Sequence, residues 1–130
     1  MCRKSFTLME LIIVVVIVGI LTTIAIPMYF KTVETARGRS AVAQLRLIQA
    51  AEKIEELEED AYAACNGFAA CNLALDIDLP ADDWAYQVVL TAAGFDATAN
   101  RNISGAGACT YTTNSTRQDP LSSANCIFIP

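Results

Sequence analysis

The chain has 130 residues, of which 54% are hydrophobic, and a formal net charge of −5. This length fits one small domain together with a membrane segment. The chain contains no histidine, and its acidic balance argues against a nucleic-acid-binding surface. No nucleophile–base pair, phosphate loop or metal-ligand cluster stands out, so the sequence predicts no enzyme, no cofactor and no metal site.

The first five residues include two basic side chains and precede a long apolar run. Arg3 and Lys4 lie directly before it. Five residues are too few for a secretory signal peptide, which needs an apolar core of its own. Positive charge on this side of an apolar segment predicts a cytoplasmic N-terminus and an outward-facing C-terminal part. An ordinary signal anchor would have the same topology.

Residues 6–30 form the apolar run, in which Glu10 is the single charged residue. As a helix these residues span about 37 Å, which is enough to cross a bilayer. A charge in such a helix costs on the order of 2–3 kcal/mol unless it is paired. Glu10 therefore predicts a positively charged partner, the alternative being an acid that stays near the headgroups. Gly19 and Pro27 both weaken helix continuity within the run.

Residues 3–11, RKSFTLMEL, resemble the N-terminus of type IV pilins and type II secretion pseudopilins. Where that family usually has Gly before the cleavage point, this chain has Ser5. The resemblance implies cleavage by a prepilin peptidase between Ser5 and Phe6, followed by N-methylation of Phe6. It also implies that Glu10 pairs with the N-terminal amine of a neighbouring subunit.

The resemblance also gives roles to Glu10, Gly19 and Pro27. A subunit inserted at the wrong height would leave the carboxylate and the amine unpaired in an apolar bundle, so Glu10 is predicted to set the register. Gly19 and Pro27 fall where the family has a helix-softening Gly and Pro. They are predicted to let the helix melt or bend when the subunit leaves the lipid, the alternative being a kinked anchor.

Residues 31–64 are predicted to continue the helix with an amphipathic surface. Apolar or small residues recur at spacings of three and four, which predicts one face that packs on a sheet. A second, shorter set lies off that face and is predicted to touch neighbouring subunits. The predicted sheet-facing residues are Val33, Ala36, Ser40, Ala43, Leu47, Ala50, Ile54, Leu57 and Ala61, and the second set is Ala41, Leu45 and Ile48.

Residues 65–130 read as a turn, a connector and several strands. Asn66-Gly67 is a strong turn signal, and the connector covers residues 69–83. Strands are predicted at 84–91, 95–101 and 108–113, with turns between them and a short last strand at 126–129. The predicted fold is α+β, a long N-terminal α-helix packed against a small antiparallel β-sheet, as in pilins.

Cleavage after Ser5 would leave four of the five cysteines. An even number in an exported domain predicts disulfides, and four cysteines allow three pairings. Cys65–Cys71 and Cys109–Cys126 are favoured because each closes a local loop. The second also resembles the C-terminal disulfide-bounded loop of many pilins. A zinc site is the rival interpretation, but the cysteine spacings do not match the usual short knuckles.

The resulting hypothesis is a structural subunit of a type IV pilus, alternatively a minor pilin or a type II secretion pseudopilin. Its expected partners are identical subunits in a helical filament, the prepilin peptidase and an assembly platform with its ATPase. It would lie in the inner membrane as a precursor and then in an extracellular filament. A membrane-anchored binding protein that never polymerises is the alternative from another class. A DNA-capturing role would need more basic residues than Arg101 and Arg117.

Overall fold

The computed structural model describes residues 6–103 and 107–130. The predicted leader with Ser5, and most of the turn predicted at 104–107, lie outside the described residues. The chain divides into two compact units, Met1–Glu34 and Thr35–Pro130. Helix α1, Leu8–Glu59, contributes to both units.

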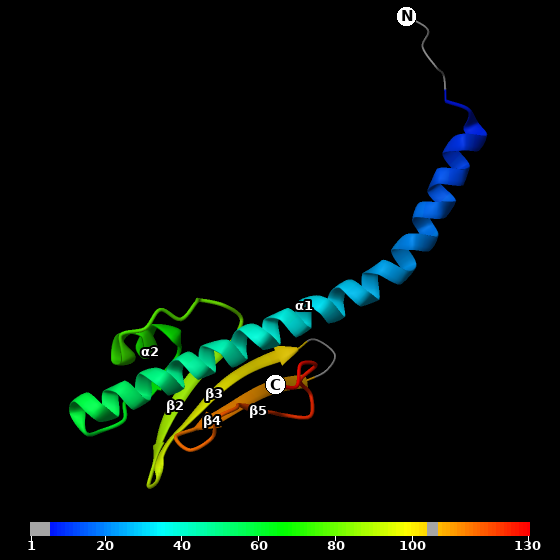
Figure 1. The fold of residues 1–130 in the computed structure, drawn as a ribbon. Helices are drawn as coiled ribbons and strands as arrows, with labels where there is room; N and C mark the ends of the chain where they lie inside the picture. Colours follow the sequence, from blue (N-terminus) through cyan, green and yellow to red (C-terminus); the bar gives the residue numbers. More distant parts are fainter. Residues whose placement is uncertain (1–5, 104–106) are drawn as a thin grey trace, which may run out of the picture. The chain divides into compact units, whose positions relative to one another are not determined.

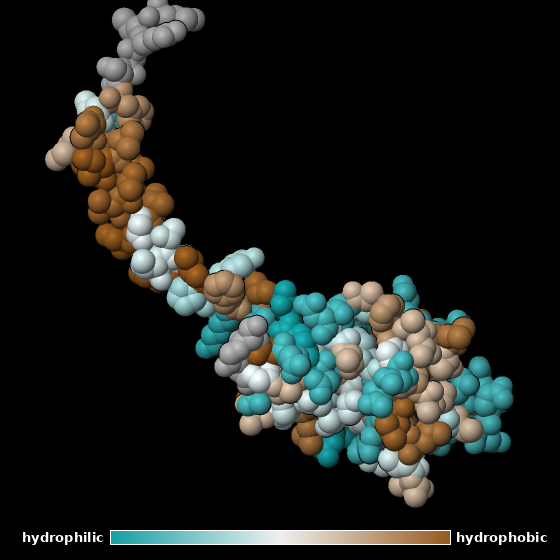
Figure 2. Space-filling model, turned by 180° about the vertical axis from the view of Figure 1, so that it is seen from behind, coloured by the Kyte–Doolittle hydropathy of each residue, from teal (hydrophilic) through white to brown (hydrophobic). Residues whose placement is uncertain are grey.

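In the first unit, α1 is a helix whose apolar side chains are exposed. Its most apolar stretch is long and hydrophobic enough to cross a membrane by length and composition, and none of that stretch is buried. The helix is continuous through Gly19 and Pro27. Figure 2 shows the hydrophobic side chains gathered along this helix. Such a surface calls for lipid or protein around it.

In the second unit, the remainder of α1 lies along one face of a five-stranded antiparallel sheet (Figure 1). The strands occur in the sheet in chain order, and a short helix, α2, packs beside the first two of them. The elements after α1 are β1 Cys65–Asn66, α2 Phe68–Leu75, β2 Ala85–Thr91, β3 Gly94–Ile103, β4 Gly107–Asn114 and β5 Leu121–Ser122. This arrangement confirms the predicted α+β fold.

The register of the sheet alternates large and small residues across the core. Tyr86 of β2 and Tyr111 of β4 both lie opposite Ala99 of β3. All three are buried. The small central residue gives space to the two aromatic rings beside it, which is how neighbouring strands fill a core without voids.

The predicted sheet-facing side of α1 is wrong. The residues of α1 that are buried in the structure are Gly38, Ala41, Val42, Leu45, Ile48, Gln49, Ala51 and Glu52. They include the set predicted to touch neighbours, and the predicted core positions from Ala36 to Leu57 are exposed. Both sets have helical spacing, so periodicity alone could not choose between them. The buried face carries Gly38, where the helix lies so close to the sheet that an added Cβ would be 2.6 Å from the Tyr111 hydroxyl oxygen.

Helix α1 also ends five residues earlier than the predicted Ala64. Its last turn carries no basic residue, and the acidic residues there oppose the negative end of the helix dipole. Asp60 then takes a left-handed conformation with φ 55°. The chain folds back, so that the Ala63 N–H donates to Glu52 Oε2 at 3.0 Å and the Tyr62 ring meets Phe95 edge-on.

The predicted strand at 126–129 is also wrong. This segment forms no regular series of backbone hydrogen bonds with a neighbouring strand. It is held by single contacts, one of which is the hydrogen bond that the Tyr111 hydroxyl donates to the Phe128 carbonyl at 2.8 Å. The fifth strand is instead Leu121–Ser122, between the strands predicted at 108–113 and 126–129. β1 occupies the position of the predicted turn. Both strands have only two residues, too few for an alternating pattern.

Glu52 is expected to make the stability of this unit depend on pH. Its side chain is fully buried, and burial raises its pKa above the ordinary 4.5. The hydrogen bond from the Ala63 N–H lowers the pKa, and the nearby charge of Glu55 raises it further. Because the folded state holds this proton more tightly than the unfolded state, stability falls as pH rises from 4.5 through the raised pKa. We expect Glu52→Gln, which cannot ionise, to flatten that fall in melting temperature between pH 4 and 7.

The matched control is Glu58→Gln, which removes the same charge from an exposed position. In this variant the melting temperature should fall with pH as steeply as in the parent protein. An equally steep fall in the Glu52→Gln variant would contradict the role given to Glu52.

Candidate functional site

Glu10 lies in the first turn of α1 with Thr7 directly before the helix. The Glu10 N–H donates to Thr7 Oγ1 at 3.3 Å, and the Thr7 hydroxyl lies 3.5 Å from Glu10 Oε2. Thr7 therefore caps the helix, and the carboxylate at the third position supports the cap. Sequence reasoning missed this local role, although the pattern Thr-x-x-Glu signals it. The cap uses hydrogen bonds without neutralising the charge, so the need for a cation remains.

The surroundings of Glu10 are apolar and uncovered. Leu8, Met9, Leu11 and Ile12 are each about half exposed or more. A helix exposed on all sides and apolar all round is stable only in lipid or among other helices. In either setting an ionised Glu10 would be expensive without a partner. The described residues 6–30 contain no cation of their own.

Gly19 and Pro27 do not interrupt α1 in this structure. The Thr22 hydroxyl donates to the carbonyls of Val18 and Gly19 at 3.0 and 2.9 Å, and the Thr23 hydroxyl to that of Ile20 at 2.7 Å. These threonines therefore bind carbonyls around Gly19, not the carbonyl of residue 23 that Pro27 leaves without its usual donor. The predicted melting of this stretch stays a prediction.

In the second unit, α1 exposes a stripe of small and apolar side chains, which we call the outer face. Its largest side chains, Leu47, Ile54 and Leu57, are 40%, 56% and 84% exposed. At about 100° per residue the stripe lies opposite the side that packs on the sheet. The outer face consists of Ala36, Ser40, Ala43, Leu47, Ala50, Ile54 and Leu57. An apolar stripe without a cover inside the subunit is suited to contact with another helix.

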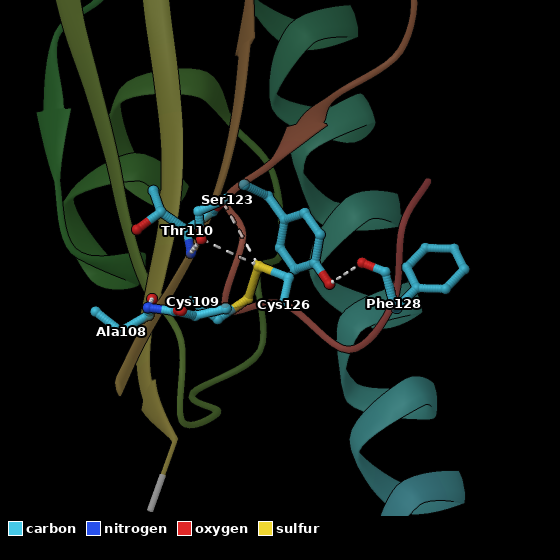
Figure 3. The surroundings of a disulfide bond; sticks show 8 residues. Ala108, Cys109, Thr110, Ser123, Cys126 and Phe128 are labelled. Carbon is cyan, nitrogen blue, oxygen red and sulfur yellow. Dashed lines mark hydrogen bonds between the residues drawn. A yellow bond between two sulfur atoms is a disulfide. The ribbon is translucent and has the colours of Figure 1, made fainter. Parts of the chain in front are cut away.

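Two disulfides tie the second unit together, in the pairing favoured from the sequence. Cys65–Cys71 joins β1 to α2, and Cys109–Cys126 joins β4 to the C-terminal segment. Around the second bond, the Thr110 N–H donates to Ser123 Oγ at 3.1 Å and the Ser123 N–H to the Thr110 carbonyl at 2.9 Å (Figure 3). The C-terminal segment thereby covers the outer edge of β4, which would otherwise offer unpaired backbone groups.

Arg101 belongs to the fold rather than to a nucleic-acid surface. It is 7% exposed, its guanidinium lies 5.3 Å from the centre of the Trp84 ring, and Asp83 is 3.9 Å away. These residues border a pocket of about 150 Å³ together with Arg37, Ser40 and Asp82. Two arginines and two aspartates balance in charge there. Among the described residues there is no group of three or more side chains suited to a metal ion.

The chain is similar to known proteins over part of its length. Residues 1–26 match the family model described as the prokaryotic N-terminal methylation motif. The type IV major pilin protein PilA of Myxococcus xanthus (strain DK1622) is 40% identical over 61 residues, which are 47% of this chain and 28% of that protein. The chain thus spans less than a third of the relative's length. No solved structure matches the chain. We conclude that residues 1–26, in which Glu10 lies in the first turn of the exposed apolar helix, carry the prokaryotic N-terminal methylation motif, and that the chain is similar over part of its length to a type IV major pilin.

Proposed function

We propose that the chain is a structural subunit of a type IV pilus and that it acts by assembly rather than by catalysis. The observation that carries this proposal is one carboxylate, Glu10, near the start of the apolar, exposed stretch of α1 that matches the methylation motif. A filament core would supply both the apolar surroundings and the missing cation. The cation would be the N-terminal amine of a neighbouring subunit, which charge pairing in an apolar bundle favours.

The proposed life cycle follows from this pairing. The precursor is anchored in the inner membrane by residues 6–30, and the prepilin peptidase frees and methylates the amine of Phe6 by cutting after Ser5. The assembly platform and its ATPase then move the subunit into an extracellular filament of identical copies. Gly19 and Pro27 are the positions at which α1 would loosen during that transfer. The domain division is leader 1–5, filament-core helix 6–30, amphipathic helix 31–64, and loop and sheet region 65–130 with the C-terminal disulfide loop.

The outer face supports assembly over the rival function of an anchored protein that never polymerises. A lone anchored domain gains nothing from a row of exposed apolar side chains on the same helix that forms its anchor. In a filament, the same side chains would be buried against a neighbouring α1. Burying one large aliphatic side chain stabilises by about 1.5–3 kcal/mol, and the gain is repeated in every subunit.

A pair of matched double variants tests this proposal. We expect Ile54→Gln/Leu57→Gln to lower the yield of sheared filaments by about tenfold or more, since each substitution removes apolar contact worth more than about 1 kcal/mol. The control is Leu73→Gln/Leu121→Gln. Its leucines are 89% and 52% exposed, against 56% and 84% for Ile54 and Leu57, but they lie on α2 and β5.

Protein levels in the membrane fraction should be equal for both variants, because all four side chains are exposed in the subunit. Filament yields would be counted by electron microscopy and immunoblot of the sheared fraction. Equal yields from the two variants would remove the outer face from the interface. A parent chain that stays in the membrane and never appears in sheared material would favour the non-polymerising anchored protein.

A further inference from the structure

Charge is distributed unevenly along α1 in the second unit. Residues 35–46 contain three arginines and no acid, whereas residues 55–60 contain five acids and no base. Of the arginines, Arg37 lies 3.7 Å from Asp83 and Arg46 lies 2.6 Å from Asp119 within the subunit. Arg39 is exposed and rests on the Phe128 ring at 5.5 Å. Arg39 is therefore the arginine of this stretch that contacts an aromatic ring and no carboxylate among the described contacts.

Arg39 and one acid, Glu58, both border the outer face. On a helical projection they lie about 50° to either side of its centre line. Both are exposed. Charges that flank an apolar stripe are the ones that meet across a contact between helices, as in coiled coils. Nineteen positions separate Arg39 from Glu58, which is about 28 Å along the helix at 1.5 Å per residue.

We propose that the outer face binds a second copy of this chain in parallel orientation, displaced by about 28 Å, so that Glu58 of one copy pairs with Arg39 of the next. The contact joins different surfaces of the two copies. A heterologous contact of this kind repeats without closing and builds a filament rather than a dimer. This inference rests on the proposed function and adds to it a particular neighbour and a particular ion pair.

The outer face alone does not fix how far one copy is displaced along the next, because apolar contact tolerates sliding along the helix axis. The ion pair would select one displacement, as charged flanks select register in coiled coils.

Charge exchange within one chain tests the pair. We expect Arg39→Glu and Glu58→Arg each to lower the yield of sheared filaments by about five- to tenfold, since each places like charges together at every contact. The double variant Arg39→Glu/Glu58→Arg rebuilds the pair with reversed polarity and should recover most of the parental yield. The matched control Arg39→Glu/Glu55→Arg has the same net charge but moves the cation away from the outer face, and it should stay as low as Arg39→Glu.

The outcomes separate this inference from the function on which it rests. Suppose that the parent chain forms filaments. If the single variants then give the parental yield, or if the exchanged double variant does not recover it, the Arg39–Glu58 contact is overturned while the proposed function as a pilus subunit is retained. No filaments from the parent chain would overturn both. Immunoblots of the membrane fraction show whether each variant accumulates. If a single variant fails to accumulate, Arg39→Gln and Glu58→Gln replace it, and each should give an intermediate yield.

Discussion

Glu10→Gln is expected to abolish filaments while leaving the subunit folded. The amide keeps the length of the side chain and can still support the Thr7 cap, but it carries no charge for a neighbour's amine. An uncompensated ammonium in an apolar core costs several kcal/mol, and the loss recurs at every subunit. We therefore expect filament yield to fall by at least about a hundredfold, which corresponds to about 2.7 kcal/mol. The measurement is the amount of this protein in sheared fractions against the membrane fraction.

Thr7→Ala is the matched control for Glu10→Gln. It removes the capping hydroxyl and keeps the charge, at a cost of about 1 kcal/mol in helix stability. Filament yield should fall modestly, because the terminal turn frays while the carboxylate still pairs. If Thr7→Ala were as severe as Glu10→Gln, Glu10 would act through the helix cap rather than through register.

Gly38→Val is expected to give the largest loss of stability in the second unit. A Cβ atom at Gly38 would lie 2.6 Å from the Tyr111 hydroxyl oxygen and 2.8 Å from Phe128 Cβ. The hydroxyl is not free to move, because it is buried and donates to the Phe128 carbonyl. Overpacking of this kind lowers the free energy of unfolding by about 1–3 kcal/mol. We expect a value at the upper end of that range, because Val is branched and the helix is closely packed at this position. Thermal unfolding in detergent measures it.

Gly19→Val is the matched control, since nothing in the subunit lies within 4 Å of a Cβ at that position. Its melting temperature should match that of the parent protein within the small difference in helix propensity. A melting temperature for Gly38→Val equal to that of Gly19→Val would mean that α1 does not approach the sheet as closely as described.

The sequence sufficed for the long helix and the antiparallel sheet, because each has a strong local signal. For the cysteines it only favoured one of three possible pairings. An uninterrupted apolar run predicts a helix, and β-branched and aromatic residues with turns between them predict strands. The sheet-facing side of α1 was predicted wrongly because two stripes compete there. The decision depends on how closely Gly38 can approach Tyr111 and Phe128, contacts that lie far apart in sequence.

Glu52 and Arg101 are two further residues whose place in the core could not be predicted from a sequence pattern. Each is a charged residue that a surface pattern would place in solvent, yet each is buried. Glu52 holds the chain that folds back after α1, and Arg101 covers Trp84. Such roles depend on partners that only the folded chain brings together. The N-terminal motif, in contrast, is local in sequence, so Phe6, Thr7 and Glu10 are recognisable as parts of one motif from the sequence alone.

The most direct test of the assembly account is the intact mass of this protein in sheared filaments, measured with and without reductant. We predict a mass that begins at N-methylated Phe6 and rises by four hydrogens on reduction, two for each of the disulfides Cys65–Cys71 and Cys109–Cys126. That result would establish cleavage after Ser5, export and both disulfides in one spectrum. A mass that begins at Met1, recovered from membranes and absent from sheared material, would contradict the account and favour an anchored protein that does not polymerise.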